Sequence, residues 1–184
     1  MEPIIPVSIA LTNALLDISS KSWKKQAQYT TLKALACERL GRELYWNAEI
    51  LFKADTGHHD KASESIRTEA FDDLVRGEIP LDIILDDSIE GIELPLNCLI
   101  KPRAIEVAKS CNTLSLLIDR VYHRLWMIKQ FPGPEISDFR STDFFDLLQF
   151  TAIFLTLMRC GTKPNGNLIT EGFKLLAENF RITL

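Results

Sequence analysis

The segment over residues 141–161, STDFFDLLQFTAIFLTLMRCG, constrains the fold more than any other part of the chain. Thr142 is a residue type that accepts a hydrogen bond from the free amides of a first helical turn. At the other end, Gly161 suits the left-handed residue that follows many helices, and Pro164 prevents the helix from continuing. The segment therefore predicts a helix over residues 142–160 with a start signal and a stop signal.

Most of the surface of this helix is apolar. Asp146 and Gln149 belong to a narrow polar strip, and a helix with so narrow a strip is buried on most sides. A helix that crosses a bilayer needs about 20 apolar residues. The run from Phe144 to Met158 is shorter, and both polar residues interrupt it. We therefore expect a core helix, and a protein without a membrane-spanning segment.

The composition is that of a globular protein. The chain has 184 residues, of which 46% are hydrophobic and 25% charged, which is enough to bury a core without disulfides. Its first residues include two prolines and lack the basic region of a secretory signal. Four widely spaced cysteines without a CxxC pair predict reduced thiols. We expect a single cytoplasmic domain over residues 1–184, in which residues 61–98 could form a charged annex.

Apolar residues at helical spacing predict further helices on both sides of the central one. We expect a helix from Pro6 with a break or a kink at the serines of 19–22, a long helix over 23–53, a helix that ends at Gly77, a long helix over 102–130, and a last helix capped by Asn167. No alternation of apolar and polar residues between turn signals indicates a strand. The predicted fold is all-α, a bundle of five to six helices, mostly antiparallel, around the helix over 142–160.

Small residues recur along one side of the expected helix over 23–53. Ala34, Cys37, Gly41 and Ala48 fall within a narrow arc of its helical wheel. Small side chains let a second helix approach closely, and such packing would explain a mid-helix glycine, which costs about 1 kcal/mol. We interpret the four residues as a close-packing seam or an interface.

Charge is distributed unevenly along the chain. Residues 69–93 contain nine acidic side chains and one arginine, whereas residues 101–129 contain six basic and two acidic side chains. Lys109, Arg120 and Arg124 share one side of the expected helix over these basic residues. Such a face can bind phosphate or RNA, or it can complement the acidic segment within a molecule or across a dimer. The net charge of −4 and the lack of interleaved aromatic residues argue against nucleic acid.

The loop between the second and third expected helices concentrates potential metal ligands: Asp55, His58, His59 and Asp60. The doublet His59-Asp60 is similar to that of the HD-type metal phosphohydrolases, which are all-helical, and this resemblance implies metal-dependent hydrolysis. Those enzymes combine the doublet with an earlier histidine, whereas no histidine precedes position 58 here. Adjacent residues rarely bind one ion, so we expect a solvated loop and no metal.

Other catalytic patterns of helical proteins are missing. In HEPN-type ribonucleases an arginine stands five residues before a histidine, and here Lys53, Ala54 and Ile118 occupy those places. The chain has no Glu-x-x-His, no HExxH and no phosphate-binding glycine loop. We therefore expect no catalytic residue and no cofactor.

These observations favour a non-enzymatic cytoplasmic helical protein that acts through protein–protein association. We expect association with itself as a homodimer, with an apolar interface, charges at its rim and no tight RNA binding. One alternative is nucleic-acid or anion binding by the basic face of helix 102–130. The other is a metal-dependent phosphohydrolase-like activity around His58, His59 and Asp60.

Overall fold

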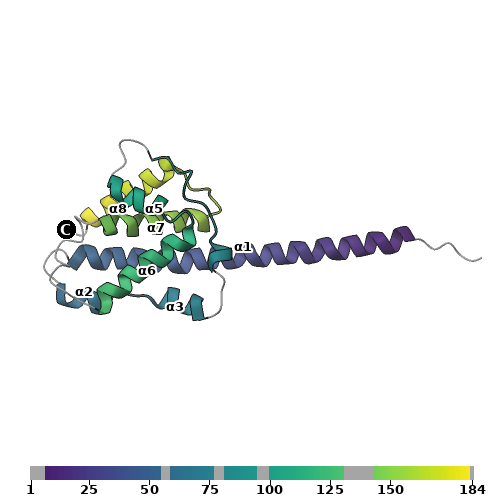
Figure 1. Ribbon diagram of the computed structural model, residues 1–184, viewed down its shortest axis with the longest axis horizontal. Coiled ribbons are helices and arrows are strands. Elements are labelled where there is room, and N and C mark those ends of the chain that lie inside the picture. Colours follow the sequence, from purple (N-terminus) through teal and green to yellow (C-terminus); the bar gives the residue numbers. More distant parts are fainter. Residues whose placement is uncertain (1–6, 55–58, 77–80, 95–99, 131–142, 183–184) are drawn as a thin grey trace, which may run out of the picture.

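A computed structural model describes the backbone of residues 7–54, 59–76, 81–94, 100–130 and 143–182, and the side chains within these ranges except those of 7–24, 59–61 and 179–182. The described residues form eight helices and no strand, and an isolated antiparallel bridge joins Ser88 to Thr113 (Figure 1). The helices are α1 (Val7–Ala54), α2 (His59–Ser65), α3 (Glu69–Arg76), α4 (Leu81–Ile84), α5 (Pro102–Lys109), α6 (Leu114–Gln130), α7 (Asp143–Arg159) and α8 (Gly166–Ile182). The expected all-α fold is confirmed, whereas the described helices outnumber the five to six that we expected.

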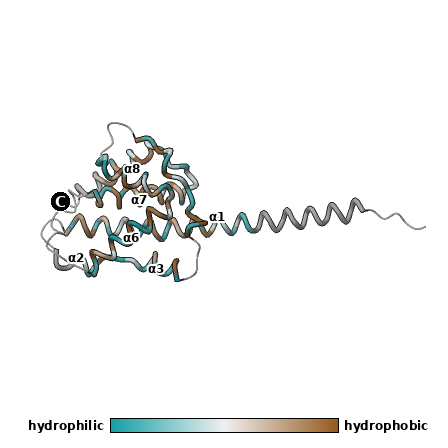
Figure 2. The backbone as a smooth tube through the Cα atoms, viewed as in Figure 1, coloured by the Kyte–Doolittle hydropathy of each residue, from teal (hydrophilic) through white to brown (hydrophobic). Residues whose placement is uncertain are grey.

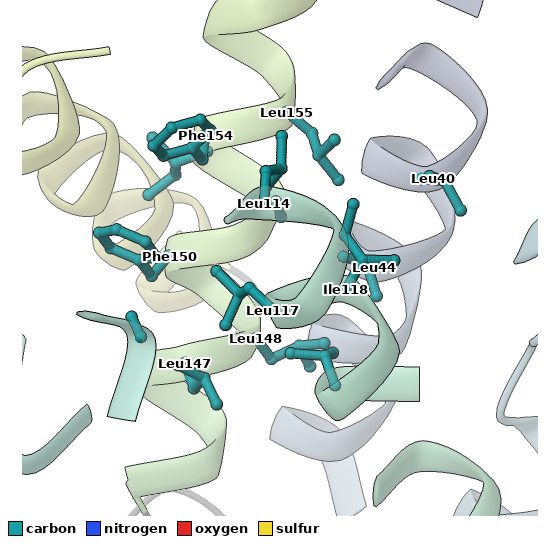
Figure 3. Packing of buried hydrophobic residues seen from close by; sticks show 14 of the residues in the cluster. Leu40, Leu44, Leu114, Leu117, Ile118, Leu147, Leu148, Phe150, Phe154 and Leu155 are labelled. Atoms are coloured by element: carbon teal, nitrogen blue, oxygen red, sulfur yellow. The ribbon is translucent and has the colours of Figure 1, made fainter. Parts of the chain in front are cut away.

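Helix α7 corresponds to the expected apolar helix over 142–160. It contacts α1, α5, α6 and α8, and every residue from Phe145 to Leu155 is buried. Side chains of α1, α6 and α7 meet in this core (Figure 3). Gly161 has the left-handed backbone expected after the helix, with φ of 67°. Within the described part of the chain, no helix is long and apolar enough to cross a membrane.

The polar side chains of α7 bond to nearby backbone. Thr151 Oγ1 donates to the carbonyl oxygen of Leu147 at 2.8 Å, and Asp146 Oδ2 accepts the amide of Lys101 at 2.8 Å. Burial raises the pKa of Asp146, against the opposing effect of that amide and the Lys101 charge. A buried carboxylate thus fixes the backbone just before α5.

Helix α1 is continuous from Val7 to Ala54, so of the break or kink expected at residues 19–22, the break is wrong. Serine lowers helix propensity only by a fraction of a kcal/mol, roughly 0.5, and three serines do not force a break. At about 1.5 Å per residue, α1 is roughly 72 Å long. Its N-terminal part extends well beyond the other helices (Figure 1), whereas its C-terminal part packs mainly against α7. We call the C-terminal part of α1 together with the helices packed around it the body, and hydrophobic residues are frequent in its helices (Figure 2).

The expected helix ending at Gly77 is divided into α2 and α3, and Gly77 itself lies outside the described residues. Buried Asn47 of α1 holds the linking residues: its Nδ2 donates to the carbonyl oxygen of Arg67 at 2.7 Å, and its Oδ1 accepts the Arg67 amide at 2.9 Å. The Arg67 guanidinium also lies 4.1 Å from the centre of the Trp46 ring. The backbone amide and carbonyl of Arg67, which lies between α2 and α3, therefore find hydrogen-bond partners on α1.

The expected helix over 102–130 is also divided, into α5 and α6. Asn112 adopts a left-handed conformation, with φ of 61°, which asparagine tolerates better than most residues. The residues at this break form hydrogen bonds with the chain after α4. The amide of Ile89 donates to the Asn112 carbonyl at 3.0 Å, and the amide of Leu114 donates to the Asp87 carbonyl at 2.9 Å. The freed backbone groups are thus satisfied by a segment more than 20 residues away in sequence.

Helix α8 begins two residues earlier than its sequence suggests. Asn165 Oδ1 accepts the amide of Leu168 at 3.1 Å, so Asn165 caps the helix, and the expected cap Asn167 lies within the first turn. Gly166 follows the cap, and a Cβ at this position would overlap the carbonyl oxygen of Glu93. The close backbone approach thus requires glycine at the start of α8.

Candidate functional site

An apolar groove lies between α1, α7 and α8, with a volume of about 580 Å³. Most of its lining is apolar, and charged side chains stand among the apolar ones on all three helices. The residues that line it are Cys37, Glu38, Gly41, Arg42, Tyr45, Ala152, Ile153, Thr156, Leu157, Arg159, Leu168, Glu171, Gly172, Leu175 and Leu176. We call this hollow the apolar groove.

Glu38 organises the charges of the apolar groove. Its Oε1 lies 2.7 Å from Arg42 Nη2 on the same helix and 3.8 Å from Arg159 Nη1 on α7. Both arginines are substantially exposed, so each pair contributes little to stability. The groove thus combines apolar walls with paired charges.

Three of the four predicted seam residues, Ala34, Cys37 and Gly41, line hollows together with residues of α7, and the fourth, Ala48, belongs to the core. Cys37 and Ala48 are completely buried, and a Cβ at Gly41 would lie 3.5 Å from Leu155 Cβ of α7. Ala34 is half-buried and lines a neighbouring hollow with Met158 of α7. These residues therefore have packing partners within one chain.

The cysteine of the seam is chemically quiet. Burial raises the pKa of the Cys37 thiol to about 11, which outweighs the lowering effect of the nearby Lys33 charge. A thiol attacks as the thiolate, so Cys37 is a poor nucleophile at neutral pH. It acts as a small apolar core residue.

A second hollow, of about 450 Å³, lies between α5, α6 and α7. We call it the basic groove, because three arginines and a histidine stand around it with one carboxylate. Its lining residues are Arg103, Val107, Arg120, His123, Arg124, Asp143, Phe144 and Leu147. The structure thus brings together Arg120 and Arg124 of the predicted basic face, whereas Lys109 is half-buried and lies outside the hollow.

The arginines of the basic groove differ in their partners. Arg103 Nε lies 3.4 Å from Asp143 Oδ2. Arg120 Nη1 donates to Ser110 Oγ at 3.1 Å and to Cys111 Sγ at 3.7 Å, which ties it to the end of α5. Within the described residues, neither Arg120 nor Arg124 forms an ion pair with a carboxylate. Among the described side chains, these two arginines therefore lack a carboxylate partner.

The acidic segment over 69–93 draws its ion pairs largely from α1. Lys33 Nζ lies 2.7 Å from Asp87 Oδ2, and Arg39 Nη2 lies 2.7 Å from Asp73 Oδ2. Burial lowers the pKa of Lys33, but the hydrogen bond and charge of Asp87 outweigh this effect and raise it overall. From the basic region 101–129, only Lys129 approaches the segment, at 4.0 Å from Glu69 Oε1, among the described pairs. Between the described residues of the acidic segment and Arg120 or Arg124, no ion pair is therefore seen within one chain.

A buried carboxylate links three helices and was missed in the sequence. Glu43 Oε1 accepts the Tyr122 hydroxyl at 2.9 Å, and Oε2 accepts the Ala70 amide at the start of α3 at 2.8 Å. Burial raises the pKa of Glu43, although both bonds oppose this effect. Tyr122 stacks on Phe71 with ring centres 4.5 Å apart. The closed surroundings indicate a structural role, and nothing in the local sequence distinguishes Glu43 from a surface residue.

The histidines do not form a metal centre among the described residues. His58 lies outside them, and His59 and Asp60 are described only as backbone in the first turn of α2. His123 lines the basic groove, and its ring stacks on that of Trp126 at 6.5 Å between centres. No three histidine, cysteine, aspartate or glutamate side chains in the described part lie close enough to hold an ion.

No protein-family model, curated protein or solved structure matches the chain. The features of the described structure that could carry a function are the two grooves and the projecting part of α1. The apolar groove offers a surface for a hydrophobic partner, and the basic groove offers one for an anion.

Proposed function

We propose that the protein is a non-enzymatic helical protein that associates with a second copy of itself. The observation that supports this most directly is the apolar groove, whose aliphatic walls remain open to solvent, with Leu175 61% exposed. Leu32 and Leu35 of α1, between the groove and the projecting part of the helix, are also exposed. Apolar surface of this kind marks protein interaction sites.

The projecting part of α1 has the sequence of a helix that binds in a groove. Helices bound in this way present apolar anchors at spacings of three and four residues. Apolar residues at such spacings in this part are Val7, Ala10, Leu11, Ala14, Leu15 and Ile18. An isolated helix of this length is marginal in water, so a partner that covers the anchors would stabilise it. We therefore assign the projecting part of α1 from a second copy as the occupant of the apolar groove.

The dimensions of α1 suit a two-fold arrangement. Tyr29 is the first described side chain of α1 that bonds to the body, through its hydroxyl to the carbonyl oxygen of Ile83 at 3.1 Å. Residues 7–28 then form an arm roughly 33 Å long, and residues 29–54 span roughly 39 Å. Antiparallel pairing of two α1 helices about residue 28 would lay each arm along the groove of the other copy. A two-fold axis would repeat the contact and close the assembly as a dimer.

Light scattering coupled to size exclusion tests this proposal. The wild-type protein should be a dimer, and Leu175→Glu in the groove or Leu11→Glu in the arm should each give monomers, because a charge would enter an apolar contact. Leu116→Glu is the matched control, since Leu116 is 53% exposed and lines neither groove. A monomeric wild type, or dissociation by the control alone, would contradict the proposal.

Cross-linking tests the register. Pairing about residue 28 brings position 11 of one copy beside position 45 of the other. Leu11→Cys combined with Tyr45→Cys, in a Cys160→Ser background that removes an exposed native thiol, should form an intermolecular disulfide. A dimer without this disulfide would refute the arm-in-groove arrangement and leave association through another surface.

A further inference from the structure

We infer that the basic groove binds a small phosphate monoester that carries an aromatic or other apolar group. The apolar residues that line the hollow are buried or half-buried, whereas its three arginines are exposed, so we call the former the apolar floor and the latter the rim. Its volume of about 450 Å³ lies within the range of small-molecule sites, about 300–1,000 Å³. The inference does not depend on the proposed dimer, because the residues of the two grooves do not overlap.

Arg120 and Arg124 provide the anion-binding part. They stand four residues apart on α6, so they occupy the same side of that helix. Neither has a carboxylate partner among the described residues, and the Arg120 side chain is held by Ser110 Oγ. The planar guanidinium matches phosphate oxygens through two parallel hydrogen bonds. A phosphate would therefore supply a counter-charge that none of the described residues provides for these two arginines.

The apolar floor selects for more than a phosphate. Val107 of α5 and Phe144 of α7 are half-buried, and Leu147 is buried beneath them. An aromatic ring placed on this floor removes apolar surface of both ligand and protein from water. Free phosphate cannot use this part of the site, so the hollow suits a ligand with both components.

The one carboxylate of the basic groove opposes an anion only in part. Asp143 is the first residue of α7 and pairs with Arg103 at 3.4 Å, so these two charges largely offset each other. With that pair set aside, Arg120 and Arg124 contribute a charge of +2 among the described lining residues. A helix N-terminus also favours negative charge, which tempers the repulsion from Asp143.

The distribution of charge favours a small ligand over an RNA strand. A strand needs a basic track along its backbone and several aromatic platforms. Lys109, the third residue of the predicted basic face, is half-buried and lies outside the hollow. Two of the three residues of the predicted basic face therefore line the hollow, and the third does not extend it into a track.

Isothermal titration calorimetry of the full chain at neutral pH tests the inference with four probes. They are phenyl phosphate, inorganic phosphate, phenol and a short single-stranded oligouridylate. Phenyl phosphate should bind about 10-fold more tightly than inorganic phosphate, since only it uses the apolar floor, and phenol should bind more weakly than phenyl phosphate. Arg120→Gln and Arg124→Gln should each weaken phenyl phosphate binding by about 10- to 100-fold.

Two further variants separate a site from a general effect of charge. Lys109→Gln removes the same charge from outside the hollow, and it should change the affinity by no more than about twofold. Phe144→Ala should abolish the preference for phenyl phosphate while inorganic phosphate still binds. Circular dichroism melting should show each variant folded, and Arg124→Gln, which breaks no hydrogen bond among the described residues, guards against a folding defect of Arg120→Gln.

The outcomes that overturn the inference are distinct. A wild-type protein that does not bind phenyl phosphate, or that binds it no better than inorganic phosphate, has no such site. Tighter binding of the oligouridylate than of phenyl phosphate, weakened equally by Lys109→Gln and Arg120→Gln, would identify an extended RNA surface instead. The expected pattern, with losses confined to groove variants, supports the site.

Discussion

Two glycines of the apolar groove allow a matched test of how closely its helices pack. Gly41 of α1 and Gly172 of α8 both face α7, and neither has a left-handed backbone. A Cβ at Gly41 would lie 3.5 Å from Leu155 Cβ, which is ordinary contact. A Cβ at Gly172 would lie 2.8 Å from Ile153 Cγ2, which is too close. The same substitution to alanine therefore differs only in its steric surroundings.

The two substitutions should change the free energy of unfolding in opposite directions. Alanine in place of glycine within a helix stabilises it by up to about 1 kcal/mol. Gly41→Ala should gain roughly 0.5–1 kcal/mol, because the added methyl group meets no clash. At Gly172 the methyl group must displace the branched Ile153 side chain, and overpacking costs about 1–3 kcal/mol. Gly172→Ala should therefore lower the free energy of unfolding, by up to about 2 kcal/mol after the helix gain is subtracted.

Urea denaturation followed by circular dichroism measures both variants against the wild type. A change in the midpoint at constant slope reports stability, and a changed slope would signal a different unfolded or native state. The titrations should be run at two protein concentrations, because dimerisation adds to apparent stability. If both variants shift the midpoint in the same direction by similar amounts, the steric reasoning about α1, α7 and α8 is wrong.

Further predictions concern the core and the buried polar groups. Asn47→Ala should cost about 1–3 kcal/mol by leaving the Arg67 backbone unpaired, whereas Arg67→Ala should cost less, which urea titration can show. Leu148→Ala should cost about 2–5 kcal/mol in the same assay, and a loss below 1 kcal/mol would mean that the core lies elsewhere. Glu43 has a raised pKa in the folded state, so its stability contribution is fully present below the unfolded pKa and is lost as pH rises through the folded pKa. Glu43→Gln should therefore flatten the dependence of melting temperature on pH between the ordinary glutamate pKa and neutrality.

The sequence predicts the parts of this fold whose signals are local. The span of α7 follows from one apolar run, its acidic first turn and the glycine after its end, and Gly161 adopts the left-handed backbone that this pattern requires. The interruptions after α2 and after α5 could not be predicted in the same way. Asn47 holds the first break from 20 residues away, and the chain near Ile89 holds the second. Such breaks depend on partners that only the folded chain brings together.

The break between α5 and α6 explains why the basic groove differs from the predicted basic face. Along one unbroken helix, Lys109 and Arg120 would be 11 residues apart, roughly three turns, and would therefore share a side. The left-handed Asn112 ends α5 and redirects the chain into α6, so that Lys109 no longer follows the line of Arg120. The break lets α5 pack beside α7, and it is Arg103 of α5 that joins Arg120 and Arg124 around the hollow. A linear face thus becomes a concave site, because its residues come from three helices that surround a common floor.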